Sequence, residues 1–139
     1  MGWPIVPGFD FAGTVEHCGK SSGFRVGQEV FGYSMFGSYS ARVVVPAAQL
    51  RERPVNIDAD CMAGVPAVAA TALHCLHLAG TWTKEHSNSI NKSKGKTSTV
   101  AAAPELLTNN KSCLIHSAAG GVGSMLVQMC KLQGYSPVV

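Results

Sequence analysis

The sequence predicts an α/β protein, and three features of the chain carry that prediction. A glycine-rich first part holds short β-like runs, a middle part has apolar residues at helical spacing, and the last part has the pattern of a strand, a glycine turn and a helix. The chain has 139 residues, 46% hydrophobic and 14% charged, which is typical of a globular protein and not of a disordered one. This length suits one modest domain or parts of two.

The first part, up to about Leu50, is predicted to be a barrel-like or irregular antiparallel unit. Its glycines recur at short intervals, and short apolar or β-branched runs lie between them: Gly13–Cys18, Gln28–Phe31 and Tyr39–Val45. Pro46 is expected to end the last run, because proline cannot donate a hydrogen bond to a strand ladder.

The next part, residues 58–82, is predicted to form linking helices. Asp58 or Asp60 can cap a first helix, Pro66 suits the first turn of a second helix, and Gly80 is a natural stop. The second helix carries residues at helical spacing: Val68, Thr71, Ala72, Cys75, Leu76 and Ala79.

Between these helices and the last part, residues 83–111 change in character to Lys, Ser, Asn and Thr. We expect a mobile, low-complexity insertion with at most one helical turn, which proteases should cut first. Its lysines at 92, 94 and 96 have no aromatic residues between them, which favours a solvated loop over a nucleic-acid patch. We therefore divide the chain into residues 1–57, 58–82, 83–111 and 112–139.

The last part, residues 112–139, has the strand–turn–helix pattern. Cys113–Ser117 is a short buried-strand pattern, Gly134 closes the following helix, and Pro137–Val139 has the pattern of another strand start. One helix face is predicted from apolar residues at three- and four-residue spacing: Val122, Met125, Leu126, Met129 and Leu132.

The turn SAAGGVGS, from Ser117 to Ser124, has two readings. Free main-chain N–H groups and the helix dipole at such a turn favour a phosphate, and glycines let a ligand approach closely. Against the GxGxxG pattern, Ala118 stands at the first glycine, Gly120 at the second and Gly123 at the third. On spacing alone, a tight turn with glycines for close packing explains the sequence equally well.

Composition excludes several other classes of function. The net charge of +3 is too small and dispersed to indicate nucleic-acid binding, and no apolar run is long enough to span a bilayer. The five cysteines form no CxxC pair, and their odd number without a secretion signal indicates a reduced, cytoplasmic setting. The pieces Gly19-Lys20-Ser21 and Gly95-Lys96-Thr97 lack the first glycine of a P-loop.

Several motifs occur in one order that resembles the zinc-free, quinone-oxidoreductase-like branch of the medium-chain dehydrogenase/reductase superfamily. They are Pro7–Val15, Val26–Gly32, Gly37–Ala41, Thr71-Ala72 and His116–Gly123. The resemblance implies a GroES-like partial β-barrel followed by the start of a Rossmann dinucleotide-binding domain, truncated at both ends. It also favours the phosphate reading of the glycine turn.

The same resemblance implies the cofactor and its contacts. Gly120, Gly121 and Val122 would lie against the pyrophosphate, and Thr71 would approach the nicotinamide. The full implied set of cofactor-binding residues is Thr71, Ser117, Ala119, Gly120, Gly121, Val122 and Gly123. NADPH is favoured over NADH, although the specificity region would lie beyond Val139.

Zinc is not expected. Zinc-dependent relatives carry Gly-His-Glu where this chain has Gly8-Phe9-Asp10, and Ala67 stands where a second ligand would be expected. His74 and His77 are three residues apart, but no third ligand is evident, so a surface or core-edge pair is the better interpretation. Tyr39, in a Gly-x-Tyr-x-Ala pattern, is interpreted as a packing residue, and no catalytic residue is assigned.

The implied function is hydride transfer from NAD(P)H to a quinone or an α,β-unsaturated carbonyl without zinc. A non-catalytic nucleotide-binding relative or decayed fragment, and an enoyl-reductase module of a larger synthase, are the alternatives. Full-length relatives are expected to be homodimers acting on small molecules. Because the later strands of the nucleotide-binding domain are missing, residues 1–139 alone are expected to bind NADPH weakly and not to turn over.

Overall fold

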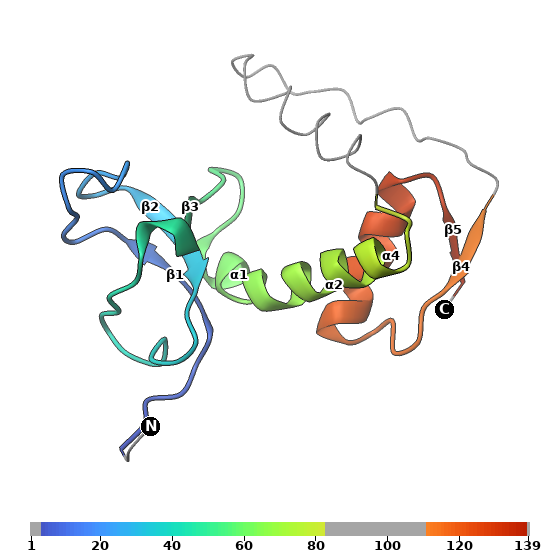
Figure 1. The fold of residues 1–139 in the computed structure, drawn as a ribbon, viewed down its shortest axis with the longest axis horizontal. Coiled ribbons are helices and arrows are strands. Elements are labelled where there is room, and N and C mark those ends of the chain that lie inside the picture. Colours follow the sequence, from blue (N-terminus) through green and yellow to red (C-terminus); the bar gives the residue numbers. More distant parts are fainter. Residues whose placement is uncertain (1–3, 83–110, 139) are drawn as a thin grey trace. The chain divides into compact units, whose positions relative to one another are not determined.

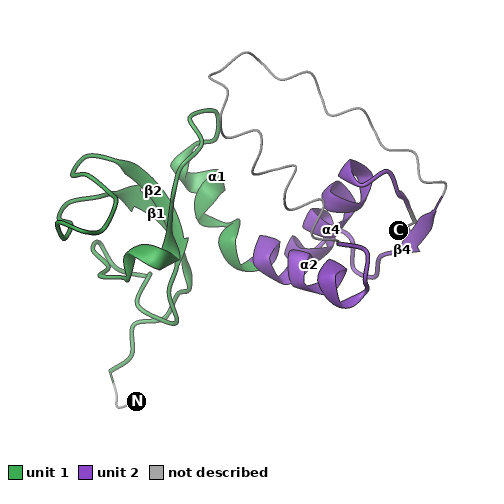
Figure 2. Cartoon of the chain, turned by 45° about the horizontal axis from the view of Figure 1, so that its top comes forward, with its two compact units in different colours: residues 1–67 green, residues 68–139 purple. Residues whose placement is uncertain are grey.

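The computed structural model describes residues 4–82 and 111–138 (Figure 1). The chain divides into two compact units, residues 1–67 and residues 68–139 (Figure 2). The boundary between the units falls inside helix α2 (Pro66–Leu78). The division of the chain into four segments, which was predicted from the sequence, stays a prediction. The predicted insertion, residues 83–111, lies outside the described residues except for Lys111.

Unit 1 contains a three-stranded antiparallel sheet in the order β1-β2-β3. Strand β1 (Asp10–Thr14) pairs with β2 (Glu29–Tyr33), and β2 pairs with β3 (Leu50–Glu52). A single 3-10 turn, Ala47–Gln49, leads into β3. Gly32 in β2 is buried, and a Cβ there would lie 2.5 Å from the Gln49 carbonyl oxygen, so this close crossing requires glycine.

Two of the predicted runs are corrected by the structure. Tyr39–Val45 is not a strand: the Ser40 hydroxyl donates to the carbonyls of Gly37 and Arg42, at 2.5 and 2.8 Å, and bends the chain. Val44 is 99% exposed, so its branched side chain buries no apolar surface that would favour a strand. Of the run predicted from Gly13 to Cys18, only Gly13 and Thr14 lie in a strand, at the end of β1, which begins at Asp10.

Two helices follow the sheet. Helix α1 (Ala59–Ala63) begins at Asp58, whose Oδ1 accepts a hydrogen bond from the Cys61 N–H at 2.7 Å. Of the two predicted caps, Asp58 is therefore the one used, and Asp60 lies in the first turn. Helix α2 (Pro66–Leu78) starts at proline as predicted, and Gly80 beyond its end has a φ of +69°.

Unit 2 contains a parallel pair of strands and helix α4 (Gly121–Leu132). Strand β4 (Ser112–Leu114) pairs in parallel with β5 (Ser136–Val138), which confirms the predicted second strand. Gly134, with a φ of +78°, follows α4 as predicted. Sequential parallel strands joined by a helix are the βαβ arrangement of doubly wound sheets.

The core of unit 2 is small. Its buried members are Leu76, Ile115 and Cys130, and half-buried neighbours pack against them: Trp82, Cys113, Ala118, Leu126, Val127, Met129 and Tyr135. The predicted apolar face of α4 is therefore only partly correct. Leu132 is 59% exposed, whereas Cys130, which is absent from the predicted face, is 3% exposed.

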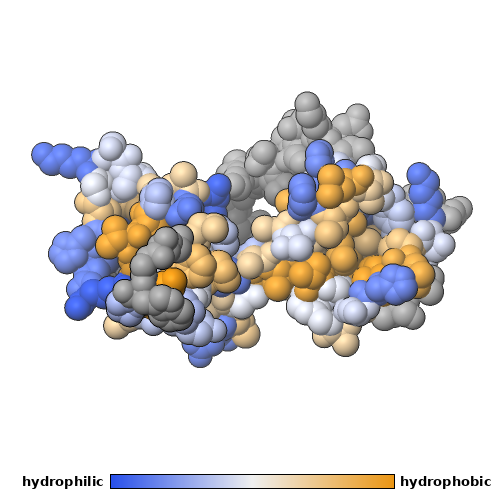
Figure 3. All heavy atoms as spheres, turned by 60° about the horizontal axis from the view of Figure 1, so that its bottom comes forward, coloured by the Kyte–Doolittle hydropathy of each residue, from blue (hydrophilic) through white to orange (hydrophobic). Residues whose placement is uncertain are grey.

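Apolar side chains also reach the surface of each unit, as Figure 3 shows for one face. Among the described helices, none is long and apolar enough to cross a membrane.

Candidate functional site

The glycine turn connects the end of β4 to the start of α4. Ile115 is buried after the strand, and the exposed His116 and Ser117 lead into the turn. The Gly120 N–H donates to the Ser117 carbonyl at 2.9 Å, which closes the turn. Ser117 has a φ of 55°, the left-handed region that non-glycine residues rarely adopt.

Gly120 is the N-cap of α4, with φ −77° and ψ 168°, and no side chain caps this helix. The first-turn N–H groups of Gly121, Val122 and Gly123 have no acceptor within the helix. Gly120 and Gly121 are both exposed. An anion at this end of α4 would therefore meet main-chain donors and the positive end of the helix dipole.

The three glycines of the turn have different roles. A Cβ on Gly123 would lie 2.2 Å from the Ser117 carbonyl oxygen, so glycine is required there for the turn to fold back on the helix. A Cβ on Gly121 would lie 2.9 Å from Cγ1 of Val68. At the exposed Gly120 the nearest atom would be the Ser117 oxygen, at 3.3 Å, so a Cβ there would require only a small shift of that carbonyl. Packing thus explains Gly123 and Gly121, and Gly120 is the position that a ligand can approach.

Val68 is a contact that the sequence did not predict. It places helix α2 against the first turn of α4, and Thr71 lies one turn further along α2 on the surface. Residues three apart on a helix are neighbours, so Thr71 belongs to the same helix face as Val68. No local pattern could have revealed this contact, since Val68 and Gly121 are far apart in the chain.

The remaining residues predicted to bind the cofactor differ in exposure. Ser117 and Ala119 are exposed, Val122 is half-buried and Gly123 is buried. The structure thus brings Ser117, Ala119 and Gly120 to the surface of one turn. Gly123 is buried behind these residues, against the main chain of Ser117 and Ala118.

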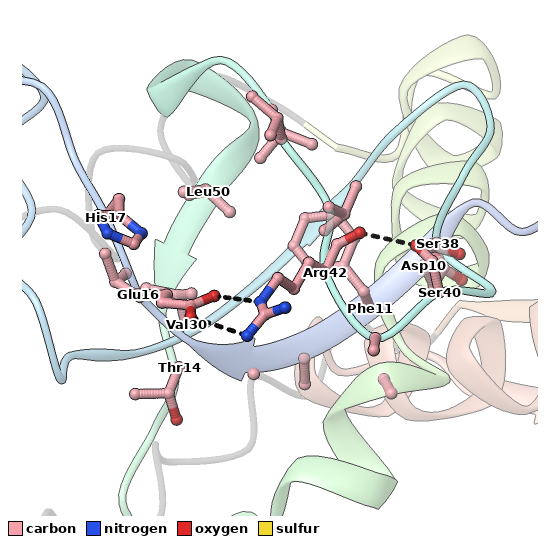
Figure 4. A pocket seen from close by; sticks show the side chains of 18 residues that line it. Asp10, Phe11, Thr14, Glu16, His17, Val30, Ser38, Ser40, Arg42 and Leu50 are labelled. Carbon is pink, nitrogen blue, oxygen red and sulfur yellow. Dashed lines mark hydrogen bonds and ion pairs between the residues drawn. The ribbon is translucent and has the colours of Figure 1, made fainter.

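Unit 1 contains a cavity of about 570 Å³ beside β1 (Figure 4). The guanidinium of Arg42 points at the Glu16 carboxylate at its edge, with Nε–Oε2 and Nη2–Oε1 distances of 2.6 and 3.1 Å. Their side chains are 78% and 53% exposed, so this ion pair contributes little to stability. The lining is mixed in polarity and holds no arrangement of nucleophile and base that indicates a reaction.

Asp10 also lines this cavity, but its carboxylate has a structural partner. Its Oδ1 accepts a hydrogen bond from the Ala67 N–H at 3.0 Å, in the first turn of α2. Burial raises the pKa of Asp10, and the hydrogen bond from Ala67 opposes that rise. The neighbouring Phe9 stacks on Tyr33, with ring centroids 6.3 Å apart, and also contacts Phe36.

These contacts bear on whether Phe9 and Asp10 could bind a metal ion. Phe9 is part of an aromatic cluster and Asp10 accepts a main-chain hydrogen bond, so neither is arranged as a ligand. Over residues 4–82 and 111–138, the structure gathers no three His, Cys, Asp or Glu side chains as a metal site requires.

Tyr39 was interpreted as a packing residue. It is 78% exposed, but its Cδ1 lies so close to Gly8 that a Cβ on Gly8 would be 2.5 Å from it.

Comparison with known proteins identifies a domain family for the first part of the chain and relatives for almost all of it. The profile of the "Alcohol dehydrogenase GroES-like domain" matches residues 1–55. "Probable polyketide synthase 15" of Dictyostelium discoideum is 28% identical over 131 residues, which cover 92% of this chain and 3% of that protein.

Solved structures share the fold over almost the whole chain. The CurK enoyl reductase matches with a TM-score of 0.69 and 23% identity, covering 96% of this chain and 33% of that one. The quinone oxidoreductase from Thermus thermophilus, solved also in complex with NADPH, matches with a TM-score of 0.63 and 20% identity, covering 99% and 34%. This chain thus spans about a third of the solved relatives and a small part of the synthase. Residues 1–55 thus match the GroES-like domain of alcohol dehydrogenases, and the chain as a whole shares the fold of these oxidoreductases.

Proposed function

We propose that the turn from Ser117 to Gly123 holds the pyrophosphate of a nicotinamide dinucleotide, with NADPH favoured over NADH. The observation that carries this proposal is the exposed, uncapped start of α4, where Gly121 and Val122 present main-chain donors. An uncapped helix start leaves donors that a ligand can satisfy, and the buried Gly123 lets the turn lie close behind them. The site residues therefore fit the group.

If this turn binds NADPH, the reaction class that we propose is the reduction of an α,β-unsaturated carbonyl, as in an enoyl-reductase module. The match to a polyketide synthase covers nearly all of this chain, and the CurK enoyl reductase shares its fold. A stand-alone quinone reductase is the second candidate, because the Thermus thermophilus enzyme shares the fold as well. When bound, a reduced nicotinamide would supply a hydride to the electron-poor carbon of the substrate.

The contribution of this chain would be binding and orientation. The N–H groups of Gly121 and Val122 would neutralise phosphate charge, and Thr71 is proposed to lie toward the nicotinamide end. A homodimer of the full-length protein is proposed on the resemblance alone, and a cytoplasmic setting is proposed from the odd number of cysteines.

Substitution of Gly120 tests the phosphate site directly. Asp, Asn and Ser all cap helices well, and the φ and ψ of Gly120 suit them, so none of these substitutions should unfold the turn. Only aspartate places a negative charge against the phosphates. In a chain extended through a complete nucleotide-binding domain, Gly120→Asp should therefore abolish NADPH binding while Gly120→Asn weakens it much less.

The measurement is NADPH titration by fluorescence or calorimetry, with the circular dichroism of each variant as the folding control. Equal affinities for Gly120→Asp and Gly120→Asn would show that phosphate does not lie at this helix end. Reduction of an enoyl thioester or of a quinone by the extended chain then separates the two candidate reactions.

A further inference from the structure

Unit 2 holds a pair of cysteines that the proposed function does not use. Cys130 lies on α4 and is 3% exposed, and the half-buried Cys113 packs against the cluster that contains Cys130. Both are free thiols, and Cys113 is close enough to affect the pKa of the Cys130 thiol. Two thiols from different elements therefore belong to one core.

Local structure explains why they meet. In β4 the side chains alternate, and Cys113 is the inward residue between the exposed Ser112 and Leu114. Cys130 lies in the last turn of α4, on the face that covers the buried Leu76 and Ile115. The contact thus joins the strand before the glycine turn to the helix after it.

The other three cysteines are in different surroundings. Cys18, Cys61 and Cys75 are exposed. The Cys18 thiol donates to the Phe24 carbonyl at 3.3 Å, and the nearby Asp58 carboxylate raises the pKa of the Cys61 thiol. These thiols provide an internal comparison for the reactivity of the pair.

We propose that Cys113 and Cys130 are a modification site, a dithiol that a peroxide oxidises to an intramolecular disulfide across the base of the glycine turn. The half-buried Cys113 thiol attacks hydrogen peroxide, gains one oxygen as a sulfenic acid and releases water. The Cys130 sulfur then attacks the Cys113 sulfur, loses its proton, and displaces the hydroxyl as a second water. Peroxide is reduced by two electrons, and the two thiols supply them.

Burial of the Cys130 thiol supports this order of steps. Burial, together with the neighbouring Cys113 thiol, raises the pKa of Cys130 to about 12. Cys130 is therefore a buried, protonated thiol at neutral pH, whereas Cys113 is half-buried and can be reached by peroxide, so the first attack falls to Cys113. The disulfide would enclose the turn from Ser117 to Gly123 between its two ends and restrict its opening.

The test uses the full 139-residue chain with Cys18, Cys61 and Cys75 replaced by serine, so that only the pair remains. After hydrogen peroxide treatment and digestion without reductant, mass spectrometry should find the peptides of Cys113 and Cys130 joined, with a loss of two hydrogen atoms. Amide exchange in residues 115–124 should slow by about tenfold or more on oxidation and recover with reductant. Link formation should be faster in buffer than in denaturant, because the native fold holds the thiols together.

Matched variants complete the test. Cys130→Val keeps the core apolar and should leave a sulfenic acid on Cys113 that dimedone captures, and Cys113→Ala should remove both products. If Cys130→Val fails to fold, the comparison of native and denatured oxidation decides alone. A Cys113 that proceeds to sulfinic acid without a link, or a link that forms only between chains and depends on concentration, would overturn the proposal.

Discussion

The carboxylate of Asp10 is 3.0 Å from the Ala67 nitrogen and caps a helix that follows far along the chain. Because Pro66 has no N–H, Ala67 is the first donor of α2 that needs a partner. Replacing Asp10 by alanine should lower the free energy of unfolding by about 1 kcal/mol relative to Asp10→Asn, which keeps an acceptor oxygen. Urea unfolding of the two variants measures this difference, and equal midpoints would show that the cap contributes nothing.

The charge of Asp10 has a separate consequence for pH. Burial raises its pKa in the folded state above the ordinary value of 3.8. As the pH rises through 3.8, the unfolded chain loses its proton first, so the folded state loses stability until Asp10 also ionises at its raised pKa. Asp10→Asn has no such titration. The stability of the wild type relative to Asp10→Asn should therefore fall as the pH rises through this window and stay level above it.

Gly123 is the glycine whose replacement should cost the most stability. An alanine Cβ would lie 2.2 Å from the Ser117 oxygen and 2.6 Å from the Ala118 Cα, and both are main-chain atoms that cannot rotate away. We expect Gly123→Ala to destabilise the protein by about 1–3 kcal/mol or more. Gly19→Ala is the control, since nothing lies within 4 Å of its Cβ and its change should stay within about 0.5 kcal/mol. Thermal unfolding compares them, and similar melting temperatures would contradict the packing role of Gly123.

At the scale of single elements, the turn before α4 stores strain at Ser117. Its φ of 55° is costly for serine and costless for glycine. Ser117→Gly should therefore stabilise the chain by about 0.5–1 kcal/mol, after the entropy of the unfolded glycine is counted. Ser117→Val should destabilise it, because a β-branched residue rarely adopts this conformation. Chemical denaturation measures both, and a loss of stability in Ser117→Gly would show that the hydroxyl has a stabilising partner.

Elements with a local signal were predicted well from the sequence. Asp58, Pro66 and Gly134 each act within one turn of the chain, and each lies at a helix end as expected. The run Tyr39–Val45 was predicted wrongly, since β-branched residues indicate a strand only where a partner strand and a buried face exist.

In the candidate site, too, local features were predicted from the sequence and contacts between distant residues were not. Its glycine turn was predicted as a phosphate site from the resemblance of the ordered motifs, because the spacing of Gly120 and Gly123 alone fitted a packing turn equally well. The contacts of Asp10 with Ala67 and of Val68 with Gly121 were not predicted, since they join residues more than fifty positions apart. Only the folded arrangement reveals which glycine packs and which is accessible.

At the scale of the whole molecule, unit 2 leaves large apolar side chains exposed. Leu78, Leu114 and Leu132 are 72%, 65% and 59% exposed. Such exposure favours self-association. Light scattering should show concentration-dependent association of the 139-residue chain, and Leu78→Lys with Leu132→Lys should reduce it without loss of helicity. In contrast, Leu76→Lys should unfold unit 2, because Leu76 is 5% exposed in its core. A monomer at all concentrations would contradict this prediction.

The small sheet of unit 2, with two strands in the described residues, should limit cofactor binding. In the described residues, the glycine turn is supported by one parallel pair, β4 and β5, by α4 and by the Val68 contact of α2. A dinucleotide also needs the neighbouring strands of a doubly wound sheet, which hold the turn and line the adenosine side. We therefore expect NADPH binding by residues 1–139 to be weak or undetectable, and no turnover, while a chain extended through a complete nucleotide-binding domain should bind. Calorimetry on both chains, with Gly120→Asp in each, makes the comparison. Micromolar binding by the 139-residue chain that Gly120→Asp abolishes would show that the turn and α4 are sufficient to hold the cofactor.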